Sequence, residues 1–376
     1  MTRLWILPVA VCGLFWGAVF VSPVDSAPMP VVRRPKVEIV FVVDTTGSMS
    51  LIEPMKTSLH HLFNLILSAR PTPELRVGLV AFKDRDTPGN KEQYLLKPFD
   101  LRDHLDEVYA EFKTYSATGG GDTPEAVNEA LDHALNKLSW SKDRRAIRMM
   151  FLIGDAAPHM DYPDDVKYPV TCARAAQLGI AIHTIQAGND QECEQHFRNI
   201  ARLAKGEYLR VDSSGGFRKW NTEYDAKLRE LSQQLLRTAM AYDVGTLRTQ
   251  GMKQVELLNG LPSDVLAYRA AIVCKTKRFF PLDFLDALYA GRLRLNDLKE
   301  EQLPEALRQT AADKRVEQVE KLLGQRQQLL EAIEELDRKR VAQVIKQMEA
   351  NPNGLEAQVF LTFRKQAAAQ LKYVDD

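Results

Sequence analysis

The chain has 376 residues, which is long for one domain and comfortable for two. It carries 50 basic and 50 acidic residues, so its formal net charge is zero, which argues against a dedicated nucleic-acid-binding protein. The apolar fraction of 45% is enough for real hydrophobic cores, and four cysteines are too few for a disulfide-dense scaffold.

The N-terminal segment has the pattern of an export signal. Arg3 is the only charged residue before Asp25, and residues 4–21 form an apolar run followed by small residues. We expect residues 1–26 to be cleaved and the protein to be secreted, periplasmic or at the cell surface. An uncleaved N-terminal anchor is the alternative, since the run is about long enough to cross a membrane when tilted. No second apolar stretch of spanning length occurs, so no membrane span is expected in the mature chain.

Export would leave three cysteines, Cys172, Cys193 and Cys274, and an odd number cannot all pair within one chain. Two alternatives remain open from the sequence. Cys172 and Cys193 form a disulfide, or all three residues are buried thiols.

Short β-branched runs alternate with segments of helical periodicity between residues 37 and 242. Such alternation predicts an α/β fold, a doubly wound, mostly parallel six-stranded sheet of Rossmann-like type covered by helices on both faces. The strands are expected at 37–44, 75–82, 93–99, 147–155, 179–188 and 206–212, with 93–99 at an edge because of Pro98. The helices are expected at 51–70, 101–113, 124–139, 166–178, 192–204 and 217–242.

The remainder, residues 243–376, is expected to be a mainly helical C-terminal region. Apolar residues between 303 and 350 fall near heptad spacing, and Gly324 and Asp337 interrupt the pattern. We therefore expect a helical hairpin or a short coiled coil, through which the chain could self-associate.

Oxygen-bearing side chains cluster where loops leave the predicted strands, at the edge of a parallel sheet where ligands bind. One segment follows the first strand, a second is a glycine-rich turn, and a third follows the strand at 147–155. Ser48 is also expected to begin the next helix. A set made only of oxygens suits a hard cation such as Mg²⁺, with Mn²⁺ or Ca²⁺ as alternatives. The candidate ligands are Asp44, Thr46, Ser48, Thr123, Glu125 and Asp155.

These segments resemble the von Willebrand factor type A (vWA) domain and its metal-ion-dependent adhesion site (MIDAS). The family motif Asp-x-Ser-x-Ser is present from Asp44 to Ser48, with Thr46 in place of the middle serine. The late aspartate of the family matches Asp155. The resemblance covers residues 37–242.

The middle ligand differs between branches of that family. Many members use a threonine in the glycine-rich loop, which would be Thr123. The Asp-Thr-Pro-Glu order is more similar to the hemicentin and integrin β versions, which would make Glu125 a ligand and place Asp122 behind the ligands. The resemblance leaves Thr123 and Glu125 as joint candidates.

The resemblance implies an exported, metal-dependent adhesion or scaffold module, not an enzyme. Its ligand would be an unknown partner protein that completes the metal shell with an exposed Asp or Glu. The alternative is a Mg²⁺-dependent phosphoryl-transfer enzyme with Asp44 as nucleophile, which lacks the lysine expected at Thr45. A metal-free packing domain is a third alternative.

Other polar residues are expected to have structural roles. His183 is expected to be a packed core histidine. Solvated loop positions are expected for His159, Asp161, Asp164 and Asp165, with the rim of the site as the alternative. Asp84 and Asp86 follow the second strand and could line the same face as the site, but a solvated loop is the expectation.

Overall fold

The computed structural model describes residues 34–85, 94–120, 123–242, 248–280 and 282–373. Residues 34–376 form one compact unit. The predicted signal at 1–26, Asp86 and Asp122 lie outside the described residues. Within the described ranges, none of the helices has the length and apolarity that crossing a membrane requires.

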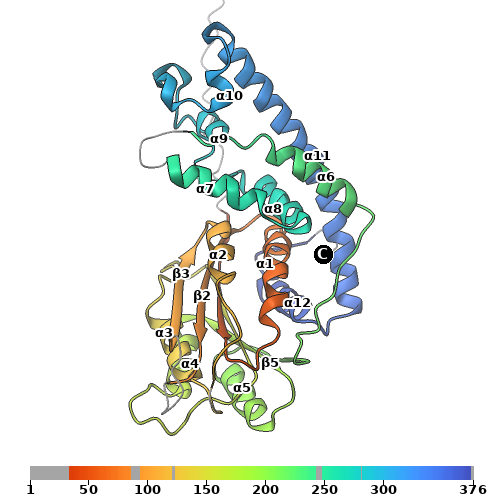
Figure 1. Cartoon of the computed structure of the whole chain (residues 1–376). Helices are drawn as coiled ribbons and strands as arrows, with labels where there is room; N and C mark the ends of the chain where they lie inside the picture. The colour runs from red at the N-terminus through yellow and green to blue at the C-terminus, as the bar shows by residue number, and fades with distance from the viewer. Residues whose placement is uncertain (1–33, 86–93, 121–122, 243–247, 281, 374–376) are drawn as a thin grey trace, which may run out of the picture. The chain divides into compact units, whose positions relative to one another are not determined.

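A six-stranded, mostly parallel sheet forms the centre of the fold, as predicted (Figure 1). The strand order is β3-β2-β1-β4-β5-β6, and only the β2–β3 pair is antiparallel. Pro98 lies on the edge strand β3, where its missing N–H costs no ladder hydrogen bond. The strands are β1 Lys36–Asp44, β2 Glu74–Phe82, β3 Leu96–Arg102, β4 Ile147–Gly154, β5 Ala181–Ala187 and β6 Tyr208–Val211.

The apolar β1 run is buried on both faces because helices cover both sides of the sheet. Ile39 and Phe41 belong to one hydrophobic cluster, whereas Val40 and Val42 belong to the other. Alternate side chains of a strand point to opposite faces, so a continuous apolar run supplies both cores. Helices α3 (Val127–Asn136), α4 (Tyr168–Leu178) and α5 (Gln191–Leu203) contribute to the second cluster. Helices α1 (Ile52–Leu67) and α2 (Leu105–Phe112) and the C-terminal helices contribute to the first.

The helices that surround the sheet and follow it are α1 Ile52–Leu67, α2 Leu105–Phe112, α3 Val127–Asn136, α4 Tyr168–Leu178, α5 Gln191–Leu203, α6 Asp225–Leu236, α7 Arg248–Asn259, α8 Ser263–Thr276, α9 Phe284–Tyr289, α10 Glu305–Arg308, α11 Arg315–Ala350 and α12 Leu355–Ala367.

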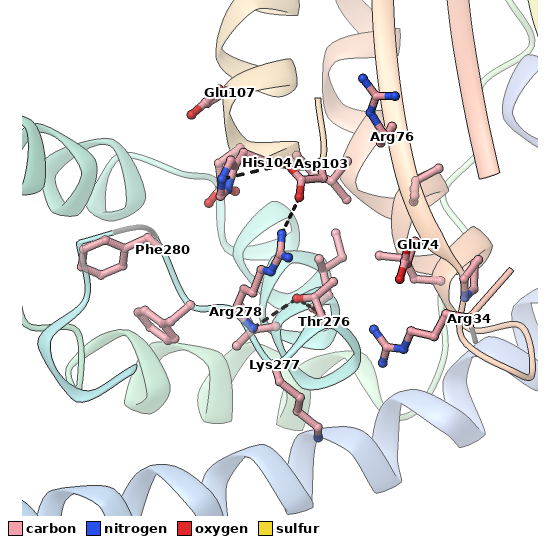
Figure 2. Close-up of a pocket in the computed structure, with 18 of the residues that line it drawn as sticks. Arg34, Glu74, Arg76, Asp103, His104, Glu107, Thr276, Lys277, Arg278 and Phe280 are labelled. Carbon is pink, nitrogen blue, oxygen red and sulfur yellow. Dashed lines mark hydrogen bonds and ion pairs between the residues drawn. The ribbon is translucent and has the colours of Figure 1, made fainter. Parts of the chain in front are cut away.

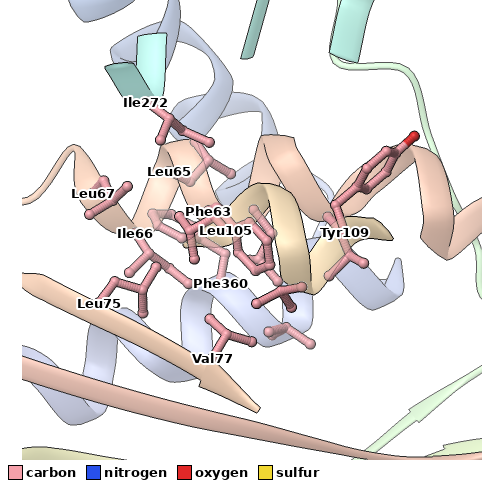
Figure 3. Packing of buried hydrophobic residues seen from close by; sticks show 14 of the residues in the cluster. Phe63, Leu65, Ile66, Leu67, Leu75, Val77, Leu105, Tyr109, Ile272 and Phe360 are labelled. Atoms are coloured by element: carbon pink, nitrogen blue, oxygen red, sulfur yellow. The ribbon is translucent and has the colours of Figure 1, made fainter. Parts of the chain in front are cut away.

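The C-terminal helices pack on α1. Helix α8 contacts α1, α6 and α11, and α12 contacts α1 and β4. Ile272 of α8 and Phe360 of α12 belong to the same cluster as Phe63 of α1 and Val77 of β2 (Figure 3). The core on this face of the sheet is therefore built by both halves of the chain. The predicted boundary between residues 242 and 243 stays a prediction.

Three details of the sequence prediction are wrong. Helix α11 is continuous for 36 residues, so neither Gly324 nor Asp337 interrupts it. Gly324 has open space around it, and the buried Asp337 accepts a hydrogen bond from Asn64. The helix expected at 217–242 is confined to α6. Helix α1 begins at Ile52 after Leu51, so Ser48 does not begin it.

All three predicted mature cysteines are free and buried. Burial raises the pKa of the thiols of Cys172 and Cys274 to about 12. Of the two alternatives left open by the sequence, the structure therefore shows three buried thiols and no Cys172–Cys193 disulfide. The prediction for His183 is confirmed, since this histidine is buried and bonded to Gln366 at 2.6 Å.

Candidate metal centre at the carboxyl ends of the strands

Asp44 ends β1, at the edge of the sheet where parallel strands present their carboxyl ends. Its side chain is only 1% exposed. Asp44 Oδ1 accepts hydrogen bonds from the Thr46 amide at 2.8 Å and from Thr46 Oγ1 at 2.7 Å. Thr46 Oγ1 lies 3.3 Å from Ser48 Oγ. The structure therefore brings the three oxygens of the first motif together.

The glycine-rich loop is fastened to the first motif by backbone hydrogen bonds. Gly47 N donates to Gly119 O at 2.8 Å, and Thr118 N donates to Thr45 O at 3.1 Å. A Cβ on Gly120 would lie 2.7 Å from Thr46 Cβ and 3.4 Å from Glu125 Oε1. Gly120 also has a φ of +77°, which favours glycine. The close approach of the two loops requires a glycine here.

Glu125 is buried beside the first motif, with its Oε1 atom 3.4 Å from the position that a Cβ on Gly120 would occupy. Its Oε2 atom is buried without a hydrogen-bond partner among the described residues. Thr123 is exposed, and within the described part no hydrogen bond joins its side chain to the other candidate ligands. The structure thus brings Glu125, not Thr123, to the cluster.

Asp155 follows β4, which pairs with β1, so it lies next to Asp44. Burial, more than any other cause, raises the pKa of Asp155, and Ser48 and Asp44 are among the neighbours close enough to influence it. A Cβ on Gly154 would lie 3.5 Å from Asp44 Oδ2, which shows how closely the two strand ends approach. Five of the six predicted ligands are therefore in one cluster.

The acidic groups of this cluster oppose one another's ionisation. Burial, followed by the charge of Asp155, raises the pKa of Asp44 to about 7. Burial, followed by the charges of Asp44, Asp84 and Asp155, raises the pKa of Glu125 to about 9. Buried carboxylates are costly unless a proton or a cation neutralises them.

A buried lysine that the sequence prediction missed links the two loops. Lys83 Nζ donates to Thr45 O at 2.7 Å and to Thr118 O, and its side chain is fully buried. Lys83 directly follows β2, at the edge of the sheet where the candidate ligands were sought. It was missed because only oxygen-bearing side chains were considered there. It fixes the spacing of the loops that carry Asp44 and Glu125.

Asp84 was predicted to be solvated, and this prediction is wrong. Its side chain is buried, 3.5 Å from His159 Nε2, and Asp84 Oδ1 accepts from the Tyr162 hydroxyl at 3.1 Å. His159 is buried as well, whereas Asp161 and Asp164 are exposed as expected. The loop after β4 folds down on the segment after β2, which removes Asp84 from water.

The residues of the cluster fit a divalent cation. The set is all oxygen, it holds three mutually repelling carboxylates, and Glu125 Oε2 has no partner in the described structure. No three His, Cys, Asp or Glu side chains of the described ranges are placed to hold a metal by themselves. A site here would accordingly draw on the hydroxyls of Thr46 and Ser48 as well as on carboxylates.

A cavity of about 960 Å³ lies at the opposite end of β1 and β2 (Figure 2). Its charged walls are largely self-paired: Arg278 contacts Asp103 at 2.6 Å, and Arg76 contacts the buried Glu38 at 2.7 Å. None of the six predicted ligands lines it. This cavity is therefore separate from the candidate metal site.

The fold and the site define an α/β domain with an acid–hydroxyl cluster at the carboxyl edge of its sheet. Residues 38–221 match the family model of the von Willebrand factor type A domain, and this part of the chain is a vWA domain. Domains of this family are generally metal-dependent protein-binding modules. A comparison with curated proteins finds no match.

Solved structures give distant similarities. Proximal thread matrix protein 1 from the mussel byssus, with a zinc-occupied MIDAS motif, is 16% identical with a TM-score of 0.38, over 48% of this chain and 42% of that chain. The VWA domain of SpRpn10 is 15% identical with a TM-score of 0.35, over 48% of this chain and 89% of that chain. These similarities say nothing of what this chain binds, and they give no support to the hemicentin and integrin β variant.

Proposed function

We infer that this chain is a divalent-metal-dependent protein-binding module that captures a carboxylate of a partner protein. The observation that carries this proposal is the convergence of Asp44, Thr46, Ser48, Glu125 and Asp155, with one buried Glu125 oxygen left without a partner in the described structure. A bound divalent cation would supply an electrophilic position for an Asp or Glu side chain.

Each residue has a distinct part in this proposal. Thr46 holds Asp44 in one orientation through two hydrogen bonds to Oδ1, which leaves Oδ2 for the cation. Ser48 is the exposed member, on the side from which a partner would approach. Lys83 holds the loops together from beneath. Mg²⁺ or Mn²⁺ suits this donor set best, and Ca²⁺ remains an alternative.

The phosphoryl-transfer alternative is less well supported. Attack by Asp44 requires an accessible carboxylate oxygen in line with the phosphorus. Asp44 is almost completely buried, and one of its oxygens already accepts two hydrogen bonds. A binding role makes no such demand on Asp44.

Export and adhesion are part of the proposal. They rest on the sequence of residues 1–26 and on the resemblance of the first motif to the MIDAS. The integrin β-like assignment of the middle ligand is likewise a proposal, supported by the position of the Glu125 side chain.

Calorimetric titration of Mg²⁺, Mn²⁺ and Ca²⁺ into the mature chain tests the metal-binding claim. We expect saturable binding by the wild type, loss of binding in Asp44→Asn, and affinity weaker by about tenfold or more in Glu125→Gln. Thr123→Val should bind as the wild type does.

Glu335→Gln is the matched control, because Glu335 is an exposed carboxylate on α11, outside the vWA part of the chain. It should leave the affinity unchanged. No heat with any of the three ions would end the proposal, and weaker binding in Thr123→Val but not in Glu125→Gln would reassign the middle ligand.

A further inference from the structure

The turn between α11 and α12 lies against the loop that follows β6, and that loop lies against the end of the first motif. We call residues 351–354 the α11–α12 turn and residues 212–216 the β6 loop. The β6 loop belongs to the vWA part of the chain, whereas the α11–α12 turn belongs to the C-terminal region. A segment of the C-terminal region is therefore only one loop away from the candidate metal centre.

A first set of contacts joins the β6 loop to the first motif. Ser50 lies two residues after the candidate ligand Ser48, and its Oγ donates to Ser213 O at 2.9 Å. The Ser50 amide also donates to Ser48 O at 2.9 Å, so the hydrogen bond to Ser213 holds the end of the motif. A Cβ on Gly215 would lie 3.1 Å from Leu51 Cβ, which shows that the two segments pack closely.

A second set of contacts joins the β6 loop to the α11–α12 turn. Leu355 N donates to Gly215 O at 2.9 Å. A Cβ on Gly354 would lie only 2.5 Å from Gly216 O, and a Cβ on Gly216 would lie 3.3 Å from Asn353 O. Backbone meets backbone here, without a flexible side chain in between. A shift of the turn would therefore move the β6 loop with it.

The α11–α12 turn has a firm base in α12. Gln358 Nε2 donates to Arg210 O of β6 at 3.0 Å. Further along α12, Gln366 Oε1 lies 2.6 Å from His183 Nε2 of β5. Leu355, the first residue of α12, is buried in the core. Because α12 is fixed to two strands of the sheet, the turn at its start supports the β6 loop from outside.

We propose that the α11–α12 turn is a positioning element for the candidate metal centre. It acts through the β6 loop on Ser50 and thereby fixes the place of the Ser48 hydroxyl in the ligand set. Loss of a group that supports metal ligands from behind commonly lowers metal affinity by about tenfold or more. This inference rests on the proposed function and adds a regulatory role for the C-terminal helices. Displacement of α11 or α12 would weaken metal binding and, with it, the capture of a partner carboxylate.

Calorimetric titration of Mn²⁺ into the mature chain with Gly354→Ala tests this inference. Gly354 has a φ of −87°, which alanine adopts without strain, so the added Cβ acts through its contact with Gly216 O. We expect the affinity for Mn²⁺ to fall by about tenfold. An affinity equal to that of the wild type would overturn the positioning role.

Gly179→Ala is the matched control. Gly179 caps the C-terminal end of α4 and precedes β5, at the edge of the sheet opposite the metal centre. Its φ of +70° means that alanine there destabilises the fold, while the added Cβ would approach Arg148 Nη2 at 3.6 Å, an ordinary contact. Gly179→Ala should bind Mn²⁺ as the wild type does. Equal losses of affinity in the two variants would attribute the effect to lower stability and overturn the inference.

Ser50→Ala tests the path through the β6 loop. It removes the hydrogen bond from Ser50 Oγ to Ser213 O at an exposed position, so the fold should be retained. We expect the affinity for Mn²⁺ to fall by about threefold. The double variant Ser50→Ala/Gly354→Ala should bind no more weakly than Gly354→Ala alone, because both changes act on the same contact. An unchanged affinity in Ser50→Ala, or losses that multiply in the double variant, would overturn this path.

The outcomes separate the two proposals. Binding of Mn²⁺ by the wild type, with the same affinity in Gly354→Ala, would overturn the positioning role and leave the metal-dependent function standing. An absence of Mn²⁺ binding by the wild type would overturn both.

Discussion

The buried guanidinium of Arg340 holds four helices of this protein together. Arg340 lies on α11 and is 1% exposed. Its Nε donates to Asp225 of α6 at 2.8 Å, one Nη donates to His61 Nε2 of α1 at 3.1 Å, and the other donates to the Tyr268 hydroxyl of α8 at 3.0 Å. Because arginine can only donate, His61 Nε2 accepts, so the proton on Nδ1 is donated to Glu356 of α12 at 2.7 Å.

Replacing Arg340 by Met keeps much of the side-chain volume and removes every one of these donors. Asp225 loses its charged partner, and His61 and Tyr268 each lose a hydrogen bond inside the core. Breaking a fully buried ion pair from one side costs about 3–5 kcal/mol. Asp225 is 18% exposed and keeps its hydrogen bonds from Thr222, so we expect Arg340→Met to lower the free energy of unfolding by about 2–3 kcal/mol.

Urea unfolding of the full chain, followed by far-UV circular dichroism, measures this loss. Arg338→Met is the control, since Arg338 lies on the same helix but is exposed, and its removal should change stability by less than about 0.5 kcal/mol. A loss below about 1 kcal/mol in Arg340→Met, equal to that in Arg338→Met, would refute the claim that this network fastens α11 to α1.

The other predictions concern pH and two glycines. Burial acts to raise the pKa of Asp106, but the charge of Arg269 and the hydrogen bonds outweigh it and hold the pKa well below its usual value. The stabilisation from Asp106 is therefore present above about pH 4 and is lost as the pH falls further. Thermal unfolding should show that Asp106→Asn is less stable than the wild type at neutral pH, and that this difference shrinks in acid. A difference in stability that stays constant with pH would contradict this reasoning. Gly120→Ala should cost about 1–2 kcal/mol for the left-handed backbone alone and should weaken metal binding, because its Cβ would lie 2.7 Å from Thr46 Cβ. Gly324→Ala, in the middle of α11 with open space around it, should instead stabilise by about 0.5–1 kcal/mol, and equal effects of the two substitutions in urea unfolding would contradict this.

The order of strands and helices in the vWA part of this protein could be predicted from the sequence alone. A run such as residues 37–44 has no polar face, so it is stable only between two layers of helices. The position of Asp44 and Asp155 at strand ends follows from the same pattern, because parallel strands end at one edge of the sheet. Local periodicity and strand direction were sufficient for these features.

Only the tertiary structure decided which of the oxygens meet and what surrounds them. The segment that turns Glu125 into the cluster is held by long-range backbone contacts, with the Glu125 amide donating to Ala157 O at 2.9 Å and the His159 amide donating to Glu125 O at 3.1 Å, and no local pattern encodes them. The burial of Lys83 depends on the carbonyl groups of another loop. Contacts between residues far apart in sequence set the environment of a buried charge, and the sequence lists the charges without their neighbours.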